Sequence, residues 1–218
     1  MLTRLDSELF PNDCEVVELK EHDQFVYLIQ KNGSSSLRKE VRNKNLKVLK
    51  NEDLAKISTV DVYIRDPIER FTSCINTYVQ HLQRDNKSLD YNTCIWFATQ
   101  YFLNTHYLPQ FHWLLNLQRF INPKCKIILH KFSDICKITN YNHKAGVNPA
   151  TKKLKNTISK SIGNDIKLWF FIDQELEYMC GESYTWSEIV NKLQQHPSRS
   201  FNILTQKFIE ISKCIVQD

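Results

Sequence analysis

Two predicted strands, each followed by a predicted helix, constrain the fold of this chain more than any other feature of its sequence. Residues 25–30 favour a strand, and a helix is predicted from about Ser35. Residues 60–65 favour a second strand, which ends at Asp66 and Pro67, where the next helix begins. Because alternating strands and helices are typical of parallel sheets, the predicted class is α/β: a central parallel sheet flanked by helices.

The helix after Pro67 has the clearest periodicity in the chain. Its apolar residues follow the i, i+3, i+4, i+7, i+8, i+11 pattern of one buried helix face: Phe71, Cys74, Ile75, Tyr78, Val79 and Leu82. Further helices are predicted at 93–107 and 110–121, on either side of Pro109. A third strand is predicted at 126–132, where two β-branched residues stand side by side.

The C-terminal third is predicted to be mostly helical. Thr185 and Glu188 have the spacing of a capping box, which predicts that a helix starts there and that helices occupy much of 183–216. We find no internal repeat and no linker rich in proline or glycine. A single domain over residues 1–218, with its core at about 25–178, is therefore predicted.

The composition is that of a water-soluble globular protein. Hydrophobic residues make up 42% and charged residues 24% of the chain, which excludes wholesale disorder and fibrous repeats. The longest apolar stretches, 127–129 and 168–172, fall far short of the ~20 residues that a membrane span needs. The first ten residues lack the apolar core of a secretory signal. We therefore expect a cytoplasmic protein with no membrane span.

Basic residues are concentrated in two stripes. Residues 31–50 hold seven lysines and arginines against the single acid Glu40, and residues 144–167 hold six lysines against Asp165. The net charge is +5. The stripes favour a polyanionic ligand: a nucleotide, a nucleic acid or an acidic glycan.

The seven cysteines are widely spread and form no C-x-x-C pair. Neither a metal site nor a disulfide framework is predicted from this spacing. We expect reduced, mostly buried thiols, with a catalytic cysteine as the alternative.

Gly33 lies in a polar loop between the first strand and its helix. Only four of the 218 residues are glycine, so each is expected to hold a required backbone geometry. The loop reads Lys-Asn-Gly-Ser-Ser-Ser over residues 31–36. Such a loop can direct backbone N–H groups, hydroxyls and a helix N-terminus at one phosphate, with Lys31 adding charge. An ordinary polar turn is the alternative interpretation.

The position of the lysine argues against a nucleotide triphosphatase. In the phosphate loop G-x-x-x-x-G-K-[ST], the lysine follows the second glycine, whereas Lys31 precedes Gly33. The arrangement instead resembles the 5'-phosphosulfate loop, P-K-[TSN]-G-[ST]-[ST]-[ST], of sulfotransferases that use 3'-phosphoadenosine 5'-phosphosulfate (PAPS). Gln30 stands where proline is common in that family.

A second motif makes the resemblance specific. Residues 62–73, Val-Tyr-Ile-Arg-Asp-Pro-Ile-Glu-Arg-Phe-Thr-Ser, resemble the 3'-phosphate element of the same family. That element is a strand ending in R-[DN]-P, then x-x-R-[FL]-x-S on a helix. The resemblance implies a fold like that of P-loop nucleoside-triphosphate hydrolases and PAPS as co-substrate, with no metal.

The resemblance also implies residue roles. Arg65 and Ser73 hold the 3'-phosphate, and Lys31 is both catalytic and cofactor-binding. The implied cofactor-binding set is Lys31, Asn32, Gly33, Ser34, Ser35, Ser36, Arg65 and Ser73. From the residues alone, Arg65 and Asp66 are equally consistent with a structural ion pair.

Weaker similarities extend the resemblance to residues 25–178. Residues 104–110 are similar to the H-[WFY]-x-P-Q segment of the carbohydrate-type branch, and 126–134 match a strand followed by an acidic turn. Asn148 and the lysines after it resemble a late loop over the nucleotide. Asp173 falls in a segment like the late helix Y-x-x-D-x-x-L/Y of that branch.

Related enzymes use a histidine or glutamate as general base, and His106 lies in the family-like segment. An imidazole with a pKa near ~6.5 suits that work at neutral pH. His106 is therefore the predicted base, and binding of the acceptor is its alternative role. The other candidates for the base are Glu40, Glu52, His81 and His112.

The expected activity is transfer of a sulfuryl group from PAPS to a hydroxyl-bearing acceptor, a glycan or a small molecule. A nucleotide or small-molecule kinase is one alternative, but it needs a Mg²⁺-binding aspartate and a lysine after the glycine. A non-catalytic RNA-binding module would explain the basic stripes. The aromatic residues stand mostly at core spacing, however, so we expect no nucleic-acid partner.

Overall fold

Six strands form one sheet in the computed structural model, which describes residues 14–85, 108–139 and 164–196. The strand order is β3-β1-β2-β4-β5-β6, with β1 (Val16–Leu19), β2 (Gln24–Tyr27), β3 (Val48–Leu49), β4 (Thr59–Ile64), β5 (Lys126–Lys131) and β6 (Ser183–Tyr184). The central strands are parallel, β2 with β4 and β4 with β5. The class is α/β, as predicted.

The prediction of a parallel sheet is wrong for the outer strands. β1 pairs antiparallel with both β2 and β3, and β6 pairs antiparallel with β5, so the sheet is mixed. β1 reaches β2 through the three-residue 3₁₀ turn η1 (Lys20–His22) and the left-handed residue Asp23. A connection this short permits only antiparallel neighbours, because a parallel pair needs a crossover of a dozen or more residues.

The helices are α2 (Ser34–Lys44), α3 (Asn51–Leu54), α4 (Pro67–Arg84), α6 (Gln110–Gln118), α8 (Asn164–Tyr178) and α9 (Trp186–Gln194), with the 3₁₀ helix η4 (Phe132–Lys137) after β5. The starts of α2, α4, α6 and α9 lie within about a residue of the predicted ones, whereas α3 was not predicted. The predicted capping box starts α9: the Glu188 amide donates to Thr185 Oγ1 and the Thr185 amide to Glu188 Oε2. The predicted helix 93–107 lies outside the described residues.

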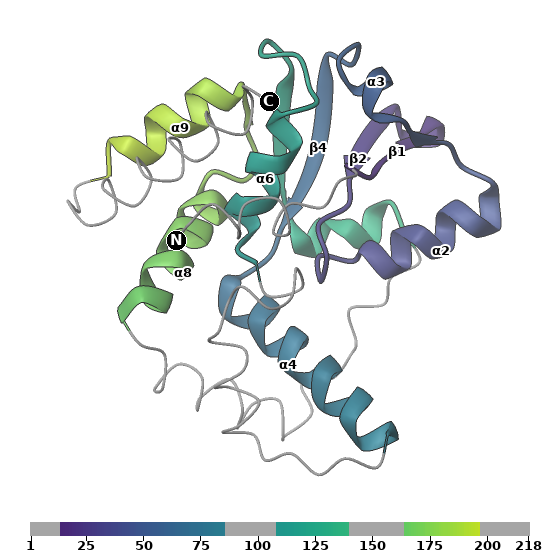
Figure 1. Cartoon of the computed structure of the whole chain (residues 1–218). Helices are drawn as coiled ribbons and strands as arrows, with labels where there is room; N and C mark the ends of the chain where they lie inside the picture. Colours follow the sequence, from purple (N-terminus) through teal and green to yellow (C-terminus); the bar gives the residue numbers. More distant parts are fainter. Residues whose placement is uncertain (1–13, 86–107, 140–163, 197–218) are drawn as a thin grey trace.

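The two faces of the sheet carry separate hydrophobic clusters. On one face, alternate residues of β4 and β5 pack with α6, α8 and α9, and residues 110–117 of α6 are all buried. On the other face, Leu37 of α2 and Ile135 of η4 pack against β1, β2 and β4. Figure 1 shows α8 and α9 on the opposite side of the molecule from α2. The carboxyl ends of β2 and β4 therefore emerge between two packed layers.

Burial of the cysteines is confirmed in part. Cys14, Cys74 and Cys125 are buried thiols that form no disulfide within the described residues, whereas the thiol of Cys136 is exposed. Among the helices in the described ranges, none is both long and apolar enough to cross a membrane.

The two glycines with positive φ in the described residues provide a test of the loop geometry. Gly33 has a φ of 77° and Gly181 a φ of 102°. A Cβ at Gly33 would overlap Ile135 Cδ1 and lie 3.3 Å from Phe132 Cε2, whereas a Cβ at Gly181 meets nothing within 4 Å.

Gly33→Ala is expected to lower the free energy of unfolding by about 2 to 4 kcal/mol, the sum of backbone strain and overpacking. Gly181→Ala carries the strain alone, about 1 to 2 kcal/mol. Urea denaturation of both variants measures the difference. Equal losses would mean that the contact with Ile135 does not constrain the loop.

Candidate functional site

The loop that follows β2 turns sharply through two residues with positive φ. Lys31 has a φ of 68° and Gly33, which precedes the first turn of α2, a φ of 77°. The first hydrogen bond of the helix runs from the Leu37 amide to the Gly33 carbonyl at 3.0 Å. The amides before Leu37 therefore lack the usual partners four residues earlier, which is the arrangement that binds anions at helix N-termini. The serines at 34–36 occupy this first turn.

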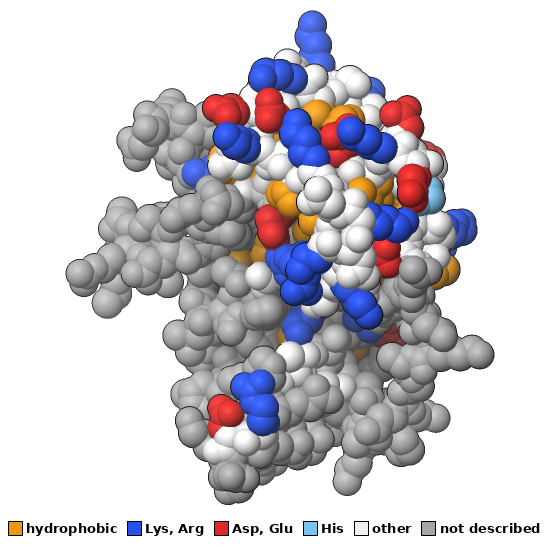
Figure 2. All heavy atoms as spheres, turned by 90° about the vertical axis from the view of Figure 1, so that its right-hand side faces the viewer, with side chains coloured by type: hydrophobic (Ala, Val, Ile, Leu, Met, Phe, Trp, Pro, Cys, Tyr) orange, Lys and Arg blue, Asp and Glu red, His pale blue; other side chains and the backbone are white. Residues whose placement is uncertain are grey.

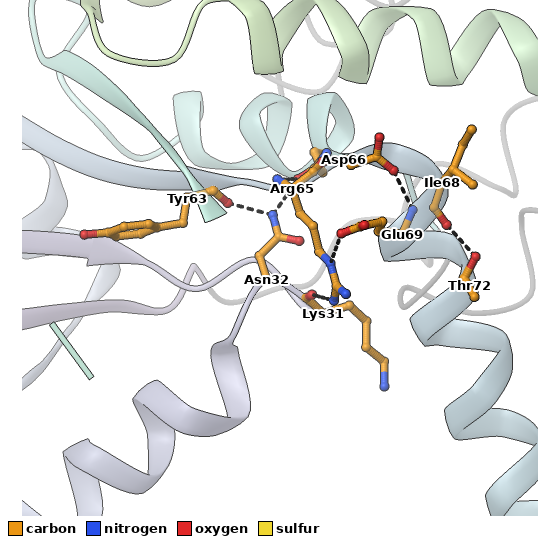
Figure 3. Close-up of polar contacts among 9 residues, drawn as sticks. Lys31, Asn32, Tyr63, Arg65, Asp66, Ile68, Glu69 and Thr72 are labelled. Atoms are coloured by element: carbon orange, nitrogen blue, oxygen red, sulfur yellow. Dashed lines mark hydrogen bonds and ion pairs between the residues drawn. The ribbon is translucent and has the colours of Figure 1, made fainter. Parts of the chain in front are cut away.

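Arg65 connects the second motif to this loop. It follows β4, which pairs in parallel with β2, so both segments leave the same edge of the sheet. Arg65 Nη1 donates to the Lys31 carbonyl at 3.2 Å (Figure 3). The guanidinium also lies 4.8 Å from the centre of the Phe132 ring. The two motifs, separated by about thirty residues in the chain, are therefore in direct contact.

The expected alternative of an Arg65–Asp66 ion pair is not the interaction seen here. Arg65 Nε lies 3.9 Å from Glu69 Oε2, and the Asp66 carboxylate accepts a hydrogen bond from the Glu69 amide at 2.7 Å (Figure 3). Asp66 thus satisfies an amide in the first turn of α4, where side-chain acceptors are favoured. Glu69 takes the place of the predicted partner of Arg65.

The Lys31 ammonium group lies against α4. Its Nζ donates to Thr77 Oγ1 at 2.8 Å. Partial burial lowers the pKa of Lys31, and the charges of Arg70 and Arg65 lower it further. Thr77 in turn donates to the Ser73 carbonyl at 3.0 Å. Lys31 therefore meets α4 one turn after Ser73, which is itself half-buried.

Arg70 is a third cation, and sequence reasoning assigned it no role. It is 3% exposed and donates to the carbonyls of Gln30, at 3.1 Å, and Leu108, at 2.6 Å. Its Nη2 is buried and has no hydrogen-bond partner among the described residues. Of the cations Lys31, Arg65 and Arg70, only Arg65 has a carboxylate within 4 Å in the described ranges. This surplus of positive charge suits an anionic ligand.

The side-chain amide of Gln110 joins the loop to the end of β4. Its Oε1 accepts from the Arg65 amide at 2.8 Å and from Asn32 Nδ2 at 2.5 Å. Its Nε2 donates to the Arg65 carbonyl at 2.8 Å and to Asp173 Oδ2 at 3.4 Å. Asn32 Nδ2 also donates to the Tyr63 carbonyl at 2.7 Å, so this predicted binding residue directs its amide nitrogen at the sheet (Figure 3).

Asp173 anchors the network from α8. It is buried, and it accepts from the main-chain amides of Gln110 at 2.8 Å and Phe111 at 2.9 Å. Burial raises the pKa of Asp173, while the charge of Arg70 and these hydrogen bonds oppose the rise. Sequence reasoning placed both Gln110 and Asp173 in family-like segments but gave neither a role. Those segments were the only signal available.

The predicted candidates for the general base do not lie together in the described residues. His106 lies outside the described residues, as does the side chain of His81. His112 is buried in α6, Glu40 is buried in α2 and Glu52 is exposed on α3. The assignment of the general base therefore stays a prediction.

The basic stripe at 31–50 is charge-paired in part, at Arg38, Lys44 and Lys50. Figure 2 shows lysine and arginine side chains interspersed with acidic ones on the face that lies on the right-hand side of Figure 1, where α2 is. Arg38 pairs with Glu15, and Lys44 pairs with both Glu21 and Glu40. The second stripe lies mostly outside the described residues. The stripe is therefore only partly compensated, and within the described residues Lys31 is one of its members with no carboxylate within 4 Å.

Comparisons of the chain with protein-family models, curated proteins and solved structures found no match. The function of this site is therefore argued from its residues and their geometry.

Arg70 offers a test of the buried part of the site. In Arg70→Lys, a single ammonium replaces the planar fork that serves two carbonyls, so we expect a loss of about 1 to 3 kcal/mol in the free energy of unfolding. Arg38→Lys is the control, because Arg38 forms a half-exposed pair with Glu15 and should cost about 1 kcal/mol or less. Urea denaturation compares the two, and equal losses would contradict the role given to Arg70.

Proposed function

We propose that this chain is a PAPS-dependent sulfotransferase with a P-loop-type sulfotransferase fold. The observation that carries the proposal is the contact between the two motifs. The Lys31 loop and Arg65 leave adjacent parallel strands, and Arg65 Nη1 donates to the Lys31 carbonyl at 3.2 Å. A ligand with phosphates at both ends of one nucleoside requires two such anion-binding segments side by side.

The chemistry of each segment supports its part in the proposal. The free amides and hydroxyls at the start of α2 bind the 5'-phosphosulfate, with Lys31 supplying a positive charge. The Arg65 guanidinium and the Ser73 hydroxyl bind the 3'-phosphate. A highly charged nucleotide also offsets the surplus of cations at Lys31 and Arg70.

The transfer step needs positioning and charge stabilisation. The bond between the sulfuryl sulfur and the bridging phosphate oxygen breaks while a bond forms to the acceptor oxygen. The hydroxyl proton of the acceptor passes to the base, for which His106 is the candidate. 3'-Phosphoadenosine 5'-phosphate leaves, and Lys31 neutralises the charge that develops on its phosphate. The proposed acceptor is a hydroxyl of a glycan or small molecule.

The first prediction from the proposed function concerns the selectivity for 3'-phosphorylated nucleotides. Arg65→Ala should weaken binding of 3'-phosphoadenosine 5'-phosphate at least about tenfold and leave AMP binding nearly unchanged, because only the first ligand carries a 3'-phosphate. Titration calorimetry measures both affinities. Arg119→Ala is the matched control, since Arg119 is likewise stacked on an aromatic ring, 5.4 Å from the centre of Phe120, but follows the far end of α6. Equal weakening of both nucleotides by Arg65→Ala would refute the assignment.

The second prediction separates catalysis from binding. Lys31→Ala should lower kcat more than it weakens nucleotide binding, because charge on the bridging oxygen develops mainly in the transition state. Steady-state transfer of labelled sulfate from PAPS to a panel of simple carbohydrates measures kcat and KM. Lys39→Ala, an exposed lysine of α2, is the control. An unchanged kcat with a raised KM would make Lys31 a binding residue only.

A further inference from the structure

The buried amide of Gln110 uses all of its hydrogen-bonding capacity on the site. Oε1 accepts two hydrogen bonds and Nε2 donates two, so no polar atom of this fully buried side chain lacks a partner. Two of these bonds go to the amide and the carbonyl of Arg65, the residue proposed to bind the 3'-phosphate. A third comes from Asn32 in the phosphate loop.

Asp173 fixes which way the Gln110 amide points. Asp173 Oδ2 accepts from both the main-chain amide and Nε2 of Gln110. A flipped amide would place Oε1 against this carboxylate oxygen and Nε2 against two donors, the Arg65 amide and Asn32 Nδ2. The orientation seen here is therefore the only one that satisfies all of these groups.

The consequence is a fixed spacing between the two halves of the site. One oxygen, Gln110 Oε1, accepts from Asn32 on the loop and from the backbone of Arg65 at the strand end. On the proposed function, we infer that Gln110 is a positioning residue that sets the selectivity for 3'-phosphorylated nucleotides. It keeps the 5'- and 3'-phosphate segments in register without touching the ligand. A shift of about 1 Å between such segments is enough to lose a productive geometry.

The test is the ratio of affinities for 3'-phosphoadenosine 5'-phosphate and AMP, measured by titration calorimetry on the full chain. Gln110→Met keeps the shape of the side chain and removes its hydrogen bonds. We expect it to reduce the ratio about tenfold, chiefly by weakening the 3'-phosphorylated ligand. Asp173→Asn is the second variant. It disturbs the orientation of the Gln110 amide from α8 and should reduce the ratio in the same direction.

Leu117→Ala is the matched control, because Leu117 is also fully buried on α6 and its loss leaves a cavity outside the hydrogen-bond network. It should lower thermal stability and keep the wild-type ratio. A wild-type ratio in a folded Gln110→Met or Asp173→Asn protein overturns the inference, as does loss of the fold in both variants. If the wild-type protein itself does not distinguish the two nucleotides, the proposed function fails instead.

Discussion

The buried hydrogen bonds of Gln110 hold together the parts of the molecule on which the site depends. A buried amide is stable only when its donors and acceptors all find partners, and here those partners come from the loop after β2, the end of β4 and α8. The hydrophobic clusters on the two sheet faces press these segments together without fixing their relative positions, because apolar contact is non-directional. The directional hydrogen bonds of the polar network fix the relative positions of these segments, which the apolar contacts alone do not.

Two cations of the site, Lys31 and Arg70, are held by hydrogen bonds to neutral groups. Thr77 accepts from Lys31, and the carbonyls of Gln30 and Leu108 accept from Arg70. Such dipoles orient a cation but do not cancel its charge, so the positive potential is preserved for a ligand. Two basic residues of α2 behave differently, since Arg38 and Lys44 are paired with carboxylates. The distinction between these two groups depends on tertiary structure and is invisible in a count of charges.

Local sequence signals predicted the parts of the fold that local chemistry decides. Gly33, Pro67 and the Thr185–Glu188 pair mark helix starts that the structure has at or within a residue of those positions. The antiparallel strands β3 and β6 are two residues long and carry no periodicity to read. The Gln110–Asp173 contact joins residues 63 positions apart, so no spacing rule could identify it. The motifs located the two halves of the site, but the residue that joins them emerged only from the fold.

The lowered pKa of Lys31 shows that placing its positive charge in the site is unfavourable for the stability of the folded chain. Burial lowers this pKa from the usual 10.5, so the charged ammonium is less stable in the folded state than in the unfolded one. The penalty is complete below the folded pKa and is relieved as the pH rises toward 10.5, because the unfolded chain then binds more protons. At neutral pH the charge of Lys31 is therefore less favourable in the folded state than in the unfolded one. An anion bound beside the ammonium would relieve that penalty, so the charge of Lys31 is unfavourable in the empty protein but consistent with the proposed nucleotide site.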